Sequence, residues 1–268
     1  MSRQYDILII DDEQVILDAV VRICSTEQLK VDVATDAHNA LAKMKKNHYR
    51  LIICDIMLPV MDGFELLEKI KPLEISTAFI MTTGYTTIEN AVKSLYLGAI
   101  DFLPKPFTSD EFWSAIKRGF KYLEIRKKKL HQKKERTDNL ILYVPCPARY
   151  FRLGYGSWLD QDYTGSVVVG ITDLFLKTVD SVENISLMEK DQEILQGNPC
   201  AVLVTRDGIQ HGILAPISGR IIKKNIRLED EVTLIEKDPF FNGWLYQVIP
   251  DDLNYQMKYL IPGGSEEL

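Results

Sequence analysis

Three aspartates and one lysine in the first 105 residues are of the types that phosphoryl chemistry requires. Asp11 and Asp12 follow the first short apolar run, Asp55 follows the third, and Lys105 follows the fifth. Carboxylates held together repel one another unless a divalent cation lies between them, and hard oxygen ligands favour Mg²⁺. A carboxylate that attacks a phosphoryl group also needs the incoming negative charge neutralised, which Mg²⁺ and an ammonium can do. These residues predict a phosphoryl-transfer site, and the Thr83 hydroxyl adds a hydrogen-bond donor.

The elements that must position these side chains alternate along the first 108 residues. Five apolar runs have the character of buried strands, at residues 7–10, 31–34, 51–54, 78–81 and 100–103, and amphipathic helical stretches lie between them. This alternation predicts a doubly wound α/β fold with a five-stranded parallel sheet. In that fold a site forms beyond the carboxyl ends of the strands. A lone aspartate there is more often a helix cap, but capping does not explain complementary groups at four strand ends.

This stretch resembles, over its full length, the receiver domain of bacterial two-component response regulators. The resemblance rests on residues 11–13, 55–63, 83–85 and 98–107. It implies that Asp55 accepts a phosphoryl group from a sensor histidine kinase or a phosphotransfer protein. Asp12 would bind Mg²⁺ directly and Asp11 mainly through water, and Asp55 with the Met57 backbone carbonyl would complete the protein ligands.

The resemblance also implies how the site responds to phosphate. Thr83 and Phe102 would form the switch pair, and Lys105, joined to Pro106 by a cis peptide bond, would pair with the phosphate. We therefore expect a phosphoacceptor and not an enzyme, apart from slow autodephosphorylation. Met57 and Tyr85 offer no group to orient an attacking water. They either slow hydrolysis or merely pack at the rim.

A helix capped by Ser109 or Thr108 is expected after the last strand. Its apolar stripe consists of Phe112, Ile116, Phe120 and Leu123. This stripe would either pack on the sheet or be the interface of a phosphorylation-dependent homodimer. Residues 117–136 hold ten Lys and Arg against two Glu. We expect a receiver over residues 1–124 and a solvated basic helical linker over 125–139. A DNA-binding regulator using the linker is the alternative, although no helix-turn-helix or other reader follows it.

Length and composition indicate an ordinary globular protein of two domains. The chain has 268 residues, of which 46% are hydrophobic and 26% charged, with a net charge of −6. No apolar run approaches the roughly 20 residues that span a bilayer, and the N-terminus has no signal segment. The four cysteines show no metal-binding spacing, so we expect reduced thiols. These features predict a cytoplasmic protein whose partners include neither a membrane nor nucleic acid.

Residues 140–268 have β character and predict a sandwich or flattened barrel. From Trp158 onward they resemble the H protein of the glycine cleavage system, a relative of biotinyl/lipoyl carriers. The resemblance rests on residues 168–173, 215–219, 225, 228, 238–240 and 243–244. It implies partners among enzymes that handle lipoyl proteins.

The residue that would carry lipoate in this family is missing. In such carriers a lysine stands eight residues before the Pro of a Pro-hydrophobic-Ser-Gly turn, and eight residues before Pro216 stands Gly208. Asp207 and Gly208 favour a two-residue turn, so we expect a hairpin without lipoate and a protein-binding output domain. An acyl carrier using another lysine is the alternative. His211 and Arg206 either bind an anion or, as is commoner for such residues, are solvated.

Overall fold

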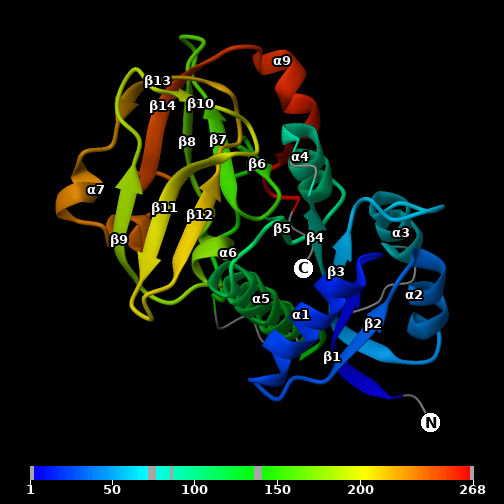
Figure 1. Ribbon diagram of the computed structural model, residues 1–268. Helices are drawn as coiled ribbons and strands as arrows, with labels where there is room; N and C mark the ends of the chain where they lie inside the picture. Colours follow the sequence, from blue (N-terminus) through cyan, green and yellow to red (C-terminus); the bar gives the residue numbers. More distant parts are fainter. Residues whose placement is uncertain (1–2, 72–76, 85–86, 136–140, 266–268) are drawn as a thin grey trace. The chain divides into compact units, whose positions relative to one another are not determined.

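The computed structural model describes residues 3–71, 77–84, 87–135 and 141–265 (Figure 1). Contacts between residues divide the chain into two units. The first comprises Met1–Thr86 with Leu97–Leu123, and the second comprises Thr87–Tyr96 with Glu124–Leu268. The helix α4 (Ile88–Tyr96) therefore belongs to the second unit by its contacts. In the part of the chain that the structure describes, no helix has the length and apolar composition needed to cross a membrane.

The first unit contains the predicted five-stranded parallel sheet. Its strands are β1 (Gln4–Ile10), β2 (Val31–Ala34), β3 (His48–Asp55), β4 (Ala78–Thr83) and β5 (Asp101–Pro104), in the order β2-β1-β3-β4-β5. Every neighbouring pair is parallel. The helices are α1 (Gln14–Ser25), α2 (Ala37–Met44), α3 (Gly63–Ile70) and the first part of α5 (Ser109–Glu135). The prediction of a doubly wound α/β fold is confirmed.

Apolar residues on both faces of the central strands explain why helices cover both sides of this sheet (Figure 1). Leu8 and Ile10 belong to one buried cluster with residues of α2 and α3. Ile7 and Ile9, which alternate with them along β1, are also buried. Strands buried on both faces are typical of parallel sheets. Asp36 and Asp62 cap α2 and α3 by accepting hydrogen bonds from backbone N–H groups.

The 27-residue helix α5 includes residues of both units. Its N-terminus is a capping box, because the Thr108 hydroxyl accepts from the Glu111 N–H and the Glu111 carboxylate accepts from the Thr108 N–H. In the predicted apolar stripe Phe112 and Ile116 are buried, and the Arg50 guanidinium lies 4.3 Å from the Phe120 ring centroid. The stripe therefore packs within the first unit. The basic segment is helical to Glu135, and residues 136–139 of the predicted linker lie outside the described residues.

The second unit contains two antiparallel sheets. The larger sheet has the order β10-β13-β14-β8-β7-β6-β15 and the smaller sheet has the order β12-β11-β9. The strands are β6 (Phe151–Leu153), β7 (Ser157–Gln161), β8 (Val167–Ile171), β9 (Val182–Leu187), β10 (Glu193–Ile194), β11 (Pro199–Thr205), β12 (Gln210–Leu214), β13 (Gly219–Lys224), β14 (Trp244–Pro250) and β15 (Ile261–Pro262). Besides α4 and the end of α5, the helices are α6 (Asp173–Leu176), α7 (Arg227–Asp230), α8 (Leu234–Lys237), α9 (Leu253–Gln256) and the 3₁₀ helix η2 (Met257–Tyr259).

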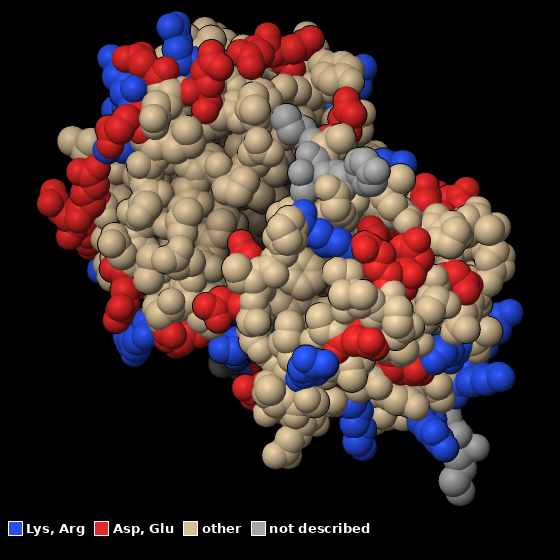
Figure 2. Space-filling view, in the orientation of Figure 1, with Lys and Arg blue, Asp and Glu red and all other residues tan. Residues whose placement is uncertain are grey.

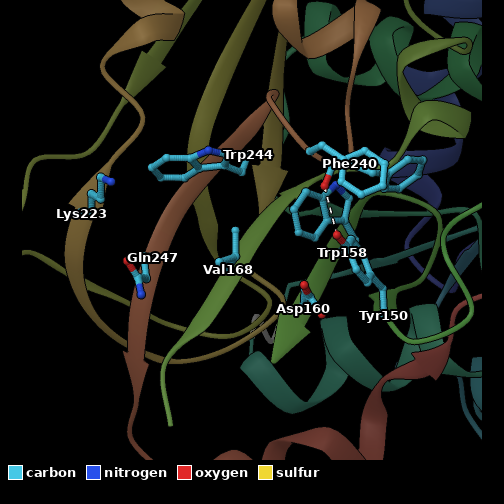
Figure 3. A pocket seen from close by; sticks show the side chains of 9 residues that line it. Tyr150, Trp158, Asp160, Val168, Lys223, Phe240, Trp244 and Gln247 are labelled. Atoms are coloured by element: carbon cyan, nitrogen blue, oxygen red, sulfur yellow. Dashed lines mark hydrogen bonds between the residues drawn. The ribbon is translucent and has the colours of Figure 1, made fainter. Parts of the chain in front are cut away.

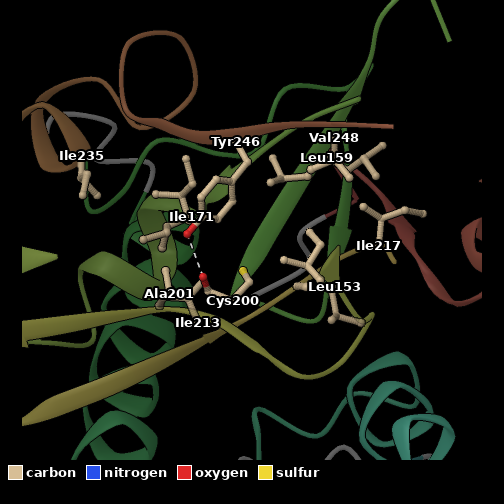
Figure 4. Packing of buried hydrophobic residues seen from close by; sticks show 14 of the residues in the cluster. Leu153, Leu159, Ile171, Cys200, Ala201, Ile213, Ile217, Ile235, Tyr246 and Val248 are labelled. Atoms are coloured by element: carbon tan, nitrogen blue, oxygen red, sulfur yellow. Dashed lines mark hydrogen bonds between the residues drawn. The ribbon is translucent and has the colours of Figure 1, made fainter. Parts of the chain in front are cut away.

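Apolar side chains from both sheets form one core cluster in the second unit (Figure 4). Ile171 and Val248 come from the larger sheet, whereas Ala201 and Ile213 come from the smaller one. The buried Tyr246 hydroxyl donates to the Cys200 carbonyl at 2.8 Å, which satisfies its polar atom inside this core. Burial raises the pKa of the Cys200 thiol to about 12. This thiol is therefore protonated and inert at neutral pH.

Candidate functional site

The carboxyl ends of three parallel strands bring the predicted chemical groups to one edge of the first sheet. Asp11 and Asp12 directly follow β1, Asp55 is the last residue of β3, and Lys105 follows β5. Ligand atoms of the three aspartates all lie within 4.8 Å of one another. Asp11 and Asp55 are buried, whereas Asp12 is exposed. Two buried carboxylates and an exposed one at this spacing form a pocket of hard oxygen ligands that opens to solvent.

Lys105 joins the two buried carboxylates. Its Nζ lies 2.6 Å from both Asp11 Oδ2 and Asp55 Oδ2, and 3.9 Å from Glu13 Oε1. Burial raises the pKa of Asp11, although Lys105 opposes that shift. Burial by itself would lower the pKa of Lys105, but hydrogen bonds to the two aspartates outweigh it and raise this pKa. Lys105 therefore remains an ammonium at neutral pH and neutralises part of the negative charge of the pocket.

Backbone groups fix the orientation of Asp55. Its Oδ1 accepts a hydrogen bond from the Met57 N–H at 3.1 Å, while its Oδ2 faces Lys105. Gly63, at the start of α3, allows the close approach of this helix, because an added Cβ would lie 2.4 Å from the Asp55 carbonyl oxygen. Neither Gly63 nor Glu13 was predicted to have a role at the site. The available indication for Gly63 was a glycine at the first position of the helix, where only a residue without a side chain allows the backbone of a neighbouring strand to come close.

Thr83 and Phe102 lie on neighbouring strands at the same edge. Thr83 is fully buried at the end of β4 and pairs with Pro104 of β5, and Phe102 pairs with Met81 two residues away. Phe102 is partly buried against the core beside the sheet. The structure thus brings the two residues to adjoining positions, and their role as a switch pair stays a prediction.

Three other predictions concern the surroundings of the site. The peptide bond between Lys105 and Pro106 is cis, as predicted. The Met57 side chain is 52% exposed, which agrees with a position at the rim. Tyr85 lies outside the described residues.

The hairpin of β11 and β12 has a different turn from the predicted one. The Gly208 N–H donates to the Thr205 carbonyl at 2.8 Å, so Arg206 and Asp207 are the central residues of the turn. Gly208 follows them with φ +78°, and Asp207 lacks the positive φ that a two-residue Asp-Gly turn needs. The prediction of a two-residue turn is wrong, because the glycine occupies the left-handed position after the turn. An added Cβ at Gly208 would meet nothing within 4 Å.

His211 is buried in the structure, so its predicted solvation is wrong. Its side chain lies against Phe175 of α6, with ring centroids 6.5 Å apart, and its Nε2 is 3.3 Å from the Thr205 hydroxyl. Thr205 is fully buried and donates to Asp207 Oδ1 at 2.6 Å. Arg206 is exposed as expected. The base of the hairpin is therefore a packed polar cluster beneath an exposed tip.

A parallel sheet with three carboxylates and a lysine at its carboxyl edge defines the class of receiver domains, and comparison with known families agrees. Residues 7–117 match the family model of the response regulator receiver domain, and residues 149–266 match that of the glycine cleavage H-protein. The chain therefore combines a response regulator receiver domain with a glycine cleavage H-protein domain.

Curated relatives match the receiver part. The transcriptional regulatory protein CutR of Streptomyces coelicolor is 33% identical over 111 residues, which are 41% of this chain and 51% of that protein. The nitrogen assimilation regulatory protein NtrX of Azorhizobium caulinodans is 37% identical over 125 residues, which are 46% of this chain and 28% of that protein. The chain thus spans about half or less of the length of these relatives.

Solved structures are similar to each part. The receiver domain of NtrX from Brucella abortus has 38% identity and a TM-score of 0.41, and the match covers 42% of this chain and 97% of that one. A glycine cleavage system H protein from Mycobacterium marinum has 25% identity and a TM-score of 0.39, with 43% and 91% covered. Receiver domains are typically non-enzymatic phosphoacceptors served by histidine kinases, and an acidic cluster such as that of Asp11, Asp12 and Asp55 is typical of their Mg²⁺ site.

Proposed function

We propose that the chain is a response regulator that accepts a phosphoryl group on Asp55 from a histidine kinase or a phosphotransfer protein. The observation that carries the proposal is the position of Asp55, whose Oδ2 lies 2.6 Å from the Lys105 ammonium within the three-aspartate pocket. In the transfer, an Asp55 carboxylate oxygen bonds to phosphorus as the bond from phosphorus to the donor histidine nitrogen breaks. The histidine nitrogen keeps the electron pair of the broken bond, and the carboxylate oxygen supplies the pair for the new one.

The donor set of the pocket fits Mg²⁺. Asp11, Asp12 and Asp55 would hold it, together with the backbone carbonyl of Met57, two residues after Asp55, and oxygen ligands of this kind suit a hard cation. Bound there, Mg²⁺ would neutralise negative charge on the phosphoryl oxygens. Lys105 would add a second positive charge beside the phosphoryl group, because its ammonium contacts the Asp55 carboxylate.

Removing Mg²⁺ or one of its ligands is expected to slow phosphorylation. Asp12→Asn should lower the rate of incorporation from phosphoramidate by about tenfold or more, since a charged contact is worth roughly 1.5–3 kcal/mol. EDTA should have at least as large an effect on the unaltered protein. The rate is measured by separating phosphorylated from unphosphorylated protein over time.

Asp18→Asn is the matched control for the Asp12 variant. Asp18 is an exposed aspartate on α1 that accepts a hydrogen bond from Gln14 at 2.8 Å and lies outside the acidic pocket. The control should retain the full rate. Incorporation into Asp12→Asn, and into the unaltered protein with EDTA, at the rate of the unaltered protein with Mg²⁺ would contradict the Mg²⁺ part of the proposal.

The second domain serves in this proposal as a protein-binding output without lipoate. By the resemblance to carriers, Gly208 would correspond to the lipoyl lysine, and a glycine has no side-chain amine for the amide bond. The buried Thr205 and His211, with the exposed Asp207 that accepts a hydrogen bond from the Thr205 hydroxyl, support the base of the hairpin. On the face shown in Figure 2, basic side chains are interspersed with acidic ones, which favours a protein partner over nucleic acid for this acidic chain.

Phosphorylation is expected to change the association or the arrangement of the two domains. Helix α5 includes residues of both units, so a change at the phosphorylated edge of the sheet has a continuous element to act on. A coupling free energy of the usual size would shift a dimer dissociation constant or an open-to-closed ratio by about fivefold or more. Sedimentation and small-angle scattering with and without the phosphoryl mimic beryllofluoride measure this. Identical profiles, with beryllofluoride binding to Asp55 verified, would remove the coupling.

A further inference from the structure

A cavity of about 250 Å³ opens on the outer face of the larger sheet in the second unit (Figure 3). The alternation along β8 shows which face this is: Val167 and Val169 belong to the core between the sheets, and Val168 between them lines the cavity. The cavity therefore lies on the side of the sheet opposite to that core. None of its lining residues belongs to the hairpin of β11 and β12.

The pairing of four strands explains how the cavity acquires its charges. Lys223 of β13 pairs with Gln247 of β14, Gln247 pairs with Val168 of β8, and Val168 pairs with Asp160 of β7. Directly paired residues in antiparallel strands point to the same face. The four side chains thus form one row across the sheet, with a cation at one end and a carboxylate at the other.

A second row gives the cavity its aromatic wall. Trp244 and Trp158 both pair with Gly170, which lies on the strand between them. A register shift between Trp244 and Tyr246 brings Trp244 to the same face as Gln247, as β-bulges do. An added Cβ at Gly170 would lie 2.4 Å from the Trp158 ring, so this glycine is what allows the ring to lie over the strand.

The aromatic floor is fixed, whereas the mouth is exposed. The Trp158 indole N–H donates to the Ile171 carbonyl at 2.9 Å, and its ring centroid lies 5.0 Å from that of Tyr150 and 6.0 Å from that of Phe240. These three rings are buried. Phe241, at the mouth, is 70% exposed. The three buried rings thus form a rigid base, and the partly exposed Trp244 and the exposed Phe241 offer the aromatic surface on which a flat ligand can stack.

The uncompensated charge of the cavity is positive. Asp160 is paired with the Arg149 guanidinium at 2.5 Å. Lys223 is exposed, with its Nζ 5.5 Å from the Trp244 ring centroid, and none of the ion pairs found among the described residues includes it. An ammonium above an aromatic face retains N–H groups for an anion.

From these features we propose that the cavity binds a small planar aromatic anion. A ligand ring would stack against Trp244 and Phe241, and its carboxylate or phosphate would accept hydrogen bonds from Lys223. The volume lies below the roughly 300–1,000 Å³ of sites for larger small molecules, so a single ring with one anionic substituent fits best. The site is separate from the phosphorylation pocket, and its existence does not depend on the function proposed for Asp55.

Titration of the full chain with simple probes tests the proposal. The chain has three tryptophans, so ¹⁵N-tryptophan labelling gives three indole signals to follow. Benzoate and phenyl phosphate should shift the Trp244 indole signal in a saturable way. Cyclohexanecarboxylate, which is not aromatic, and benzylamine, which has the opposite charge, should each bind about tenfold more weakly.

Lys223→Gln should weaken benzoate binding by about tenfold, because it removes the one charged contact to the anion. Lys258→Gln is the matched control, since Lys258 also lies over an aromatic ring of this domain, 4.9 Å from the Tyr255 ring centroid, but outside the cavity. This control should bind benzoate normally. The proposal is overturned if benzylamine binds as well as benzoate, if the two lysine variants behave alike, or if no probe shifts the Trp244 signal.

Discussion

Asp55→Asn is expected to reduce phosphoryl incorporation from phosphoramidate to the background level. Asparagine has nearly the same shape as aspartate but no carboxylate oxygen to form the acyl phosphate. The Asp55 side chain is already oriented for attack on a phosphoryl group, because the Met57 N–H donates to Oδ1 and the Lys105 ammonium donates to Oδ2. Intact mass spectrometry and electrophoresis that retains acid-labile phosphate measure the loss.

Two further variants locate the effect at the pocket. Lys105→Ala should retain Mg²⁺ binding by the three aspartates but impair phosphate-dependent switching, because it removes the ammonium that contacts Asp55. Asp110→Asn changes an exposed aspartate at the start of α5 and should incorporate normally. An Asp55→Asn protein that is folded by circular dichroism and still acquires the acid-labile phosphate at full stoichiometry would show that another residue is the acceptor.

The unaltered chain is expected to remain without lipoate when co-expressed with a lipoate ligase, whereas a hairpin given a lysine should accept it in part. The resemblance to H proteins implies a hairpin tip of Glu, Ser, Val and Lys at positions 205 to 208, so a family-like tip would need Ser, Val and Lys at positions 206 to 208. The full family sequence also has Glu at position 205, but Thr205 is fully buried beside His211, and a carboxylate there would be desolvated. The suitable variant is therefore Arg206→Ser/Asp207→Val/Gly208→Lys with Thr205 retained.

The backbone at Gly208 sets the cost of this variant. The Cβ of a lysine at position 208 would have no atom within 4 Å, so the side chain fits. The backbone must keep φ +78°, which costs about 1–2 kcal/mol of stability for a residue other than glycine. Gly165→Lys is the matched control, because Gly165 also has a positive φ, +84°, and open space around an added Cβ. Intact mass should show lipoate on the hairpin variant only.

Two outcomes of this experiment would change the account. A lipoyl mass on the unaltered chain would overturn the binding-module proposal in favour of an acyl carrier that uses another lysine. A hairpin variant that folds, as thermal unfolding would show, and yet never accepts lipoate would mean that the resemblance to carriers is limited to architecture.

The strands and acidic pocket of the first unit could be predicted because local patterns determine them. Runs of apolar residues buried on both faces define parallel strands, and the strand ends then place Asp11, Asp55 and Lys105 at one edge regardless of side-chain detail. The capping of α5 at Thr108 follows in the same way from neighbours in sequence.

The features that the sequence did not predict depend on contacts between distant residues. His211 is buried because Phe175 of α6 packs against it, which no local pattern indicates. The type of hairpin turn depends on the φ of Asp207. An Asp-Gly pair fits two turn types, so the sequence alone does not decide between them. The outer cavity depends on the register of four strands and on a bulge near Trp244. Each of these requires the tertiary structure.

Direct mapping of the phosphorylated residue tests the central claim. After phosphorylation with phosphoramidate and Mg²⁺, borohydride reduces an aspartyl phosphate to homoserine, and tandem mass spectrometry of the peptides locates the change. We predict homoserine at position 55 alone, because Asp55, among the aspartates that the structure describes, combines a buried carboxylate at a strand end with the contacts from the Met57 N–H and the Lys105 ammonium. Homoserine at position 11 or 12, or a phosphoryl group on a residue outside the pocket, would contradict the account.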